Sequence, residues 1–341
     1  MRRMGGLPRG RGAAASMDRA RKVMRASVSA FFDGYHCFTS VAALLALPFS
    51  AAVLAASAAA PSSALLHGVA FRLRAVFAAA GFPSDSAFFS LLEAKLSQTV
   101  AAFTFALPFS LTFLLLAKAA VAAMLRPDND GSSPARRRLN ALPPCAAVAR
   151  AYPALVATHL FNAFVMLSAN AAAFSLLLLG FGAADLLGVD AASRPQTNLA
   201  LSAAGAAVYS LAIGVATVVC NLAAIAAAME RGRVAGHAAA LRACVLIRGR
   251  VSTALALALP TNLAMAAAEA LFQLRVVAQR QRDGGRLKPG VAGEAFSIAY
   301  IHALCVVMEI VVGCMFYRSC TKREADEMRE LEPEEKGDFQ A

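Results

Sequence analysis

The chain has no tryptophan and only five tyrosines among its 341 residues, and charged residues make up only 16% of it. Hydrophobic residues make up 59%. A soluble fold of this length cannot enclose so much apolar surface, so a purely soluble protein is excluded. Without tryptophan, the aromatic belts that usually mark the two membrane surfaces are reduced to tyrosine and phenylalanine.

Motifs of catalysis and metal binding are missing as well. No HExxH, GxSxG or GxxxxGK[ST] sequence occurs, and no paired acids stand in a metal-binding arrangement on an apolar run. The seven cysteines have no CxxC spacing, so neither a zinc site nor a disulfide framework is indicated. The sequence therefore predicts no catalytic residue, no cofactor and no metal.

What the chain does contain is six long apolar runs. Each holds, or nearly holds, the roughly 20 apolar residues that a spanning helix needs. Alanine and leucine dominate the runs and period-2 alternation is missing, which favours helices over the strands of a β-barrel. We predict an all-α polytopic membrane protein, a bundle of six transmembrane helices at about 37–60, 99–125, 151–182, 199–228, 251–272 and 295–317.

Basic residues outside these spans gather in alternate gaps. The N-terminal segment, the second and fourth gaps and the C-terminal tail hold 23 of the 33, whereas the other three gaps hold nine. Such an excess marks the cytoplasmic side, so both termini are predicted to be cytoplasmic. The fifth gap, residues 273–294, is as basic as the inner ones and opposes this assignment. An endomembrane or the plasma membrane is favoured over an organelle.

The predicted partner is the lipid bilayer. The net charge of +12 is explained by the orientation bias, and no basic patch interleaved with aromatics supports a nucleic-acid partner. Residues 1–33 predict a basic cytoplasmic tail that rests on anionic lipid headgroups. The same segment is Arg-rich with Asp18 as its only acid before residue 30, which is also typical of an organelle targeting segment.

Two further segments flank or interrupt the predicted transmembrane domain, residues 34–317. Residues 61–97, between the first two spans, mix apolar and charged residues and predict interfacial helices along the outer surface. Residues 318–341 are acidic with little apolar content, so we expect a disordered cytoplasmic tail.

Polar residues inside the spans lie at nearly one depth. Five of them stand eight to twelve residues from a basic residue at a predicted cytoplasmic end, or about 12–18 Å along a helix. A sixth, Asn162, shares the helix face of His159. The members of this predicted layer are Lys118, His159, Asn162, Asn221, Asn262 and Glu309.

Two contacts are expected from these depths. An unpaired charge near the bilayer centre costs about 2.5–3.5 kcal/mol, so Lys118 and Glu309 are predicted to form an ion pair. Glu269 and His302 lie nearer the outer ends of their spans and predict a second, shallower contact. Glu269 has the alternative of reaching the outer headgroups.

Two functions fit this pattern. In the leading interpretation the polar layer lines a path for an ion, a proton or a small solute. In the other, the layer is structural, each interhelical hydrogen bond contributing around 0.6 kcal/mol. The protein is then a non-catalytic scaffold or membrane-shaping protein that acts through its interfacial helices and charged tails.

Two stretches carry a resemblance to a known family. Leu246-Ile247-Arg248-Gly249-Arg250-Val251 enters the fifth span, and Val-Val-Met-Glu-Ile-Val-Val-Gly-Cys-Met-Phe-Tyr-Arg-Ser-Cys, residues 306–320, closes the sixth. With them, residues 17–322 resemble plant six-span integral membrane proteins that have no established activity. The resemblance implies a helical bundle in a cellular membrane of a plant, and it supplies no catalytic or ligand-binding residue.

Overall fold

The computed structural model describes residues 9–59, 64–79, 97, 100–126, 143, 145–186, 195–284 and 288–337. All regular structure in these residues is helical, and six helices are long and apolar enough to cross a membrane. The predicted all-α bundle of six spans is thereby confirmed. The spans are Tyr35–Ala56, Val100–Leu125, Cys145–Ala173, Ala203–Met229, Val251–Arg282 and Pro289–Asp326.

The first two spans each contain a π-helical turn two residues from a proline. The turn η1 (Ala42–Ala46) precedes Pro48, and η3 (Ser110–Leu114) follows Pro108. Because proline has no N–H, the regular hydrogen-bond ladder is interrupted beside it, and a wider turn absorbs the mismatch. Around these turns lie the other helices of the two spans, α2 (Tyr35–Val41), α3 (Leu47–Ala59) and α6 (Leu115–Leu125).

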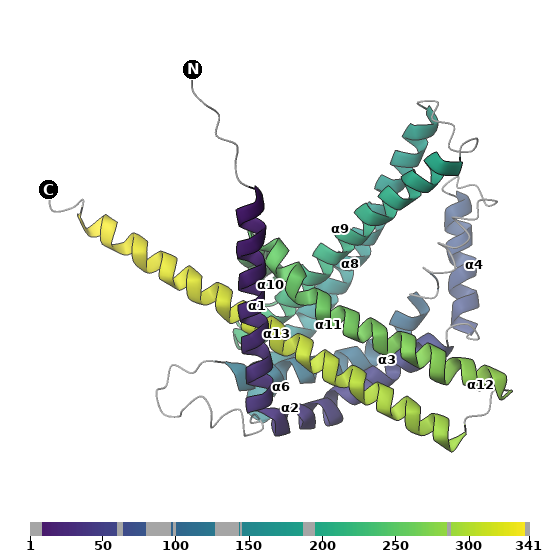
Figure 1. The fold of residues 1–341 in the computed structure, drawn as a ribbon, viewed down its shortest axis with the longest axis horizontal. Helices are drawn as coiled ribbons and strands as arrows, with labels where there is room; N and C mark the ends of the chain where they lie inside the picture. The colour runs from purple at the N-terminus through teal and green to yellow at the C-terminus, as the bar shows by residue number, and fades with distance from the viewer. Residues whose placement is uncertain are drawn as a thin grey trace.

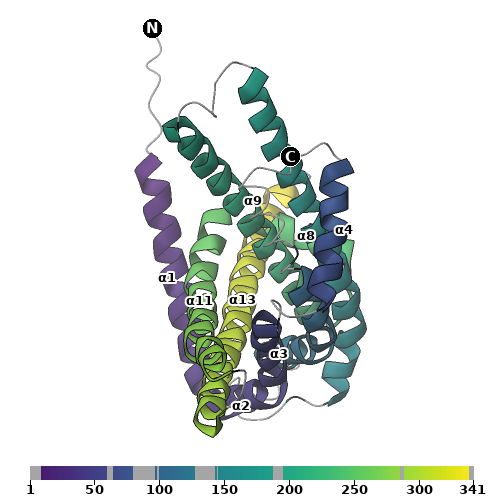
Figure 2. The same cartoon turned by 90° about the vertical axis from the view of Figure 1, so that its right-hand side faces the viewer.

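The remaining spans form two hairpins that diverge from a common base (Figure 1). Figure 2 shows the same separation from the side. The sixth span lies at the centre, because it packs against helices of the first, second, fourth and fifth spans. The helices of the two hairpins are α8 (Cys145–Leu186), α9 (Pro195–Met229), α11 (Val251–Phe272) and α13 (Pro289–Gly337).

The bundle is tightest at this base. Every residue from Leu222 to Met229 at the end of α9 is buried, and five of these eight are alanine. Small side chains let helix backbones approach closely, which replaces the hydrophobic driving force that lipid does not supply. The short helix α10 (His237–Ile247) follows and packs against α9, α8 and α13.

The basic N-terminal tail is helical over residues 9–33. These residues form α1 (Arg9–Asp33), which runs across the α11–α13 hairpin rather than alongside it (Figure 1). Ala20, Val23 and Ser27, at helical spacing, are buried, and the helix packs against α13 and α11. This packing stabilises a helix that would be marginal in isolation.

The acidic tail, for which the sequence predicts disorder, is helical in the residues described. The helix α13 continues without a break to Gly337. Elongating an existing helix needs no new nucleus, and Glu, Lys, Arg, Met and Leu are all favourable helix residues. Acidity alone therefore did not distinguish a solvated helix from a disordered tail.

The fifth span is ten residues longer than expected. It continues from α11 through η4 (Gln273–Val277) and α12 (Ala278–Arg282). At 1.5 Å per residue its 32 residues extend about 48 Å, well beyond the roughly 30 Å hydrocarbon core. The link to α13 is short, and Lys288 Nζ lies 2.8 Å from Asp283 Oδ1 across it.

A separate helix lies in the long first gap. It is α4 (Ala64–Ala79), and Phe71, Arg72 and Arg74 on it are exposed. In Figure 1 the axis of α4 is nearly parallel to that of α1, on the other side of the bundle.

Candidate functional site

A cavity of about 300 Å³, here called the outer cavity, brings most of the predicted polar residues together. Its walls come from the first, second, fourth, fifth and sixth spans, which also supply apolar residues such as Phe49 and Met265. Six of the eight residues singled out in the sequence line it: Lys118, Asn221, Asn262, Glu269, His302 and Glu309.

A second, smaller cavity of about 60 Å³, the inner cavity, lies closer to the predicted cytoplasmic ends. Its walls are mostly apolar and include Leu257 and Phe316. By the same measure about 10–15 Å³ is enough for one water molecule, so both cavities have room for water. Lys118, Asn221 and Glu309 line both cavities. We call these three residues the central trio.

The central trio is not held together by the ion pair expected from the sequence. Asn221 Nδ2 donates a hydrogen bond of 2.8 Å to Glu309 Oε1, and in the described part of the chain no ion pair joins Lys118 to Glu309. Lys118 and Glu309 do line the same cavities, as their matching depth predicts. The side-chain amide of Asn221 on α9, however, lies beside the Glu309 carboxylate and takes the place expected for the Lys118 ammonium group. Lys118 is only 9% exposed, so its charge interacts with Glu309 through the cavities rather than in direct contact.

At the outer end of the outer cavity, a histidine lies between two other helices. His302 on α13 is 3% exposed, and its Nδ1 lies 2.9 Å from Ser50 Oγ on α3. Its Nε2 lies 3.7 Å from Glu269 Oε1 on α11. The side chain of Glu269 is 49% exposed, so this carboxylate connects the buried imidazole to the surface of the bundle.

The other two predicted residues are placed between helices rather than on a cavity. His159 Nε2 lies 3.3 Å from Ser110 Oγ in η3. Asn162 Nδ2 donates a 2.7 Å hydrogen bond to the carbonyl of Cys220 on α9, and its buried Oδ1 has no hydrogen-bond partner among the described residues. Both side chains therefore act as interhelical contacts, the structural role considered for the whole layer.

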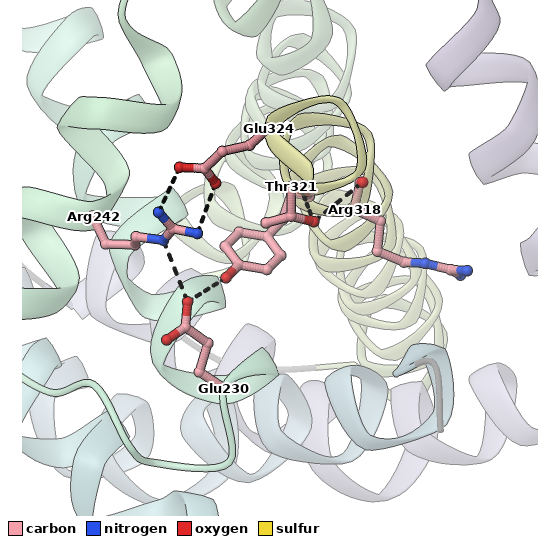
Figure 3. Close-up of polar contacts among 6 residues, drawn as sticks. Glu230, Arg242, Arg318, Thr321 and Glu324 are labelled. Atoms are coloured by element: carbon pink, nitrogen blue, oxygen red, sulfur yellow. Dashed lines mark hydrogen bonds and ion pairs between the residues drawn. The ribbon is translucent and has the colours of Figure 1, made fainter. Parts of the chain in front are cut away.

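A polar network that the sequence reasoning missed joins α9, α10 and α13 at the base of the bundle. Figure 3 shows Arg242 placed between two carboxylates. Its Nη1 and Nη2 each donate a 2.8 Å hydrogen bond to Glu324, and its Nε lies 3.5 Å from Glu230 Oε1. The hydroxyl of Tyr317 donates to the same Glu230 oxygen. We call these four residues the basal cluster.

Arg242 is a fixed positive charge between the two carboxylates of the basal cluster. The hydrogen bonds to Glu324 raise the pKa of Arg242, so the guanidinium stays charged. Tyr317 and Glu324 lie on the same face of α13 as Glu309, so their helical spacing from Glu309 is the sequence signal from which they could have been predicted. Glu230 and Arg242 carry no such signal. Glu230 stands just before a tight turn at positive-φ Gly232, where a Cβ would lie 3.1 Å from the carbonyl oxygen of Arg150, and Arg242 lies within the short helix α10.

A family model described as a domain of unknown function (DUF8558) matches residues 19–330. The chain belongs to this family. The match begins inside α1 and ends inside α13, so the domain of this DUF8558 protein includes most of α1, both cavities and the basal cluster. No curated protein and no solved structure matches the chain. Among the residues described, no three His, Cys, Asp or Glu side chains are grouped to hold a metal ion.

Proposed function

We propose that this integral membrane protein moves a small solute or ion across its membrane through the outer and inner cavities. The observation that carries the proposal is that the central trio, Lys118, Asn221 and Glu309, lines both cavities. The trio is then the constriction at which passage between them is controlled.

The contrast with the structural polar residues supports this role. Side chains that only join helices make direct contacts and line neither cavity, as His159 does with Ser110. Lys118 instead lies on the walls of both cavities, and among the described residues no direct ion pair joins it to Glu309, the carboxylate on the same cavities. A charge retained on a cavity wall is typical of ion and substrate paths.

The orientation and source are part of the same proposal. The positive-inside bias supports cytoplasmic termini, with the inner cavity and the basal cluster on the cytoplasmic side. The resemblance of residues 17–322 to plant six-span proteins supports a plant origin, with an endomembrane or the plasma membrane as the location.

The proposal is tested by measuring whether water reaches the cavities from the solvent. In a cysteine-free background, Ala266→Cys in the outer cavity and Ala258→Cys in the inner cavity should react with a membrane-impermeant thiol reagent. Leu263→Cys is the matched control on the same helix, because Leu263 is 67% exposed on the outside of the bundle and is expected to face lipid.

We expect both cavity cysteines to react at least about tenfold faster than the control, because thiolates form in water and hardly at all in hydrocarbon. Labelling of Ala266→Cys from the outside and of Ala258→Cys from the cytoplasm would also fix the orientation. Equal, slow labelling of all three positions would reject a water-filled path and leave the polar layer as structural contacts.

A scaffold or membrane-shaping role is the second candidate, and α1 is the observation that favours it. The exposed residues Met17, Val28 and Phe32 form an apolar stripe beside the buried face of α1. Arg21 lies within the stripe and Arg25 at its edge, where long basic side chains can reach the headgroups. A helix with this pattern lies in the plane of a membrane surface with its basic residues on anionic headgroups.

The absence of native tryptophan makes α1 directly measurable. A Phe32→Trp variant in anionic vesicles should be quenched by lipids brominated near the headgroup end of their chains, because the stripe is buried about 5–10 Å into the boundary. Ala26→Trp, at an exposed position on the other side of the helix from the stripe, should instead be quenched by aqueous iodide. Similar iodide quenching of both variants would show that α1 does not lie in the membrane surface.

A further inference from the structure

One face of the central helix carries an ionisable side chain about every two turns. His302, Glu309, Tyr317 and Glu324 are seven or eight residues apart, which keeps them on one side of α13. The separation between neighbours is about 10–12 Å along the helix. Only His302 and Glu309 among these residues were predicted from the sequence as candidate site residues.

Each of the first three has a polar partner on a neighbouring helix. His302 contacts Glu269 on α11 and Ser50 on α3. Glu309 accepts a hydrogen bond from Asn221 on α9. The Tyr317 hydroxyl donates to Glu230, directly after α9. The face is therefore turned inward along its whole length, and its members are ordered by the bundle.

The gaps between these groups are too long for direct proton transfer, and the cavities lie in two of them. The outer cavity is lined by both His302 and Glu309, and its volume gives water a place between the imidazole and the carboxylate. The inner cavity is lined by Glu309 and, nearer the base, by Phe316, whereas Tyr317 is the next residue of α13 and lies outside its lining. Gly313 lies between them and also lines the cavity, with Ile225 of α9 packed against it.

Both ends of the series reach the surface. Glu269 is 49% exposed at the outer end, and at the basal end the side chains of Glu230 and Glu324 are 26% and 41% exposed. The ionisable groups between them are the most enclosed. Chains of acidic and histidine side chains that connect two surfaces in this way are typical of proton relays in membrane proteins.

We propose that the ion carried by this path is the proton, and that α13 relays it through His302, Glu309 and Tyr317. The inference rests on the proposed function and names its ion. A proton bound to the Glu269 carboxylate passes to Nε2 of His302, forming an imidazolium. The imidazolium loses a proton to water in the outer cavity and returns to neutral imidazole, and Glu309 takes that proton up. Glu309 then releases a proton to water in the inner cavity and becomes a carboxylate again. From this water a proton passes on to the Tyr317 hydroxyl as that hydroxyl's own proton moves to Glu230, which releases it to the solvent at the basal end.

The charges that face Glu309 suit this role. Lys118 from α6 lines the same two cavities as Glu309. Its ammonium group would repel a free cation there, whereas a proton carried on Glu309 makes a neutral carboxylic acid that the ammonium group does not repel. Asn221 from α9 and Thr261 from α11 line the inner cavity without charge, and His302 and Glu269 face Glu309 across the outer cavity. A metal cation would have to pass the ammonium, whereas a proton passes as a neutral carboxylic acid.

The test uses the full chain in proteoliposomes with a pH-sensitive dye trapped inside. A potassium diffusion potential, negative inside, is set with valinomycin to pull protons inward. The parent should acidify the lumen faster than protein-free vesicles. Glu309→Gln and His302→Gln should each slow acidification at least tenfold, and Tyr317→Phe should slow it by removing only the hydroxyl.

Matched controls make the same chemical changes away from the path. Glu294→Gln lies on α13 and His36→Gln at the start of α2, and both side chains are exposed. Both variants should acidify at the parent rate. Thermal unfolding of every variant in the same lipid identifies those that fail to fold, and Tyr317→Phe, which keeps the ring, tests the relay even if a buried variant does not fold.

Three results would overturn the proposal. The first is acidification by the parent that Glu309→Gln, His302→Gln and Tyr317→Phe leave unchanged. The second is no acidification by the parent although Ala266→Cys and Ala258→Cys are labelled, which rejects the proton but leaves the proposed solute path. The third is neither acidification nor labelling, which rejects the relay and the proposed function together.

Discussion

The Glu309→Leu variant is expected to unfold with a free energy lower than that of the parent by about 2.5–3.5 kcal/mol, the cost of an unpaired charge near the bilayer centre. The substitution removes the carboxylate that shares both cavities with the buried ammonium of Lys118. It also removes the hydrogen bond from Asn221, which contributes around 0.6 kcal/mol. Equilibrium unfolding in mixed micelles measures the difference.

The double variant Lys118→Leu/Glu309→Leu should recover most of this loss, because it leaves no charge uncompensated. A coupling energy of about 2 kcal/mol or more between the two positions is therefore expected from the cycle. Asn221→Ala is the control that removes only the hydrogen bond, with a cost near 0.6 kcal/mol. Strictly additive losses at positions 118 and 309 would show that the two charges do not compensate each other.

The position of the polar layer could be predicted from sequence because helices convert residue number into depth. A rise of 1.5 Å per residue placed Lys118, Asn221, Asn262 and Glu309 at one level, and all four line the outer cavity. Helical phase placed Asn162 on the same face as His159, and in the structure Asn162 donates a hydrogen bond to the carbonyl of Cys220 on α9. Depth and phase are local properties of a single helix.

Contacts between helices could not be predicted in the same way. The choice of Asn221 rather than Lys118 as the partner of Glu309 depends on how α9 and α6 are rotated against α13. Rotation is set by packing of many small residues, and the alanine-rich spans carry little sequence signal for it. His159 shows the same limit, since it shares the expected depth and contacts Ser110 instead of a cavity.

The helical structure of the two tails could not be predicted from their content of charged residues. A high content of charged residues is typical of the exposed face of a helix and equally typical of a disordered chain. In α1 the buried positions Ala20, Val23 and Ser27 are small and do not raise the mean hydropathy of the segment. Their spacing over two turns is the signal of a packed helix.

Gly313 is the position at which the inner cavity can be closed without removing an ionisable group. It lies on α13 on the same face as Glu309, and it lines the inner cavity. A Cβ added there would overlap Cδ1 of Ile225 on α9, which is itself buried. Gly313→Leu should therefore fill the cavity and press α9 and α13 apart, at a cost of about 1–3 kcal/mol for overpacking.

With Gly313→Leu, thiol labelling of Ala258→Cys should slow at least about tenfold, to the rate of a cysteine that faces lipid. Gly313→Ala should slow it less, and adding Ile225→Val should restore it, because the overlapping Cδ1 is then missing. Gly293→Ala, on the same helix, adds a Cβ with no described atom within 4 Å, so labelling should be unchanged and stability higher by up to about 1 kcal/mol. Labelling of Ala258→Cys at the parent rate in the folded Gly313→Leu protein would contradict a water path through the inner cavity.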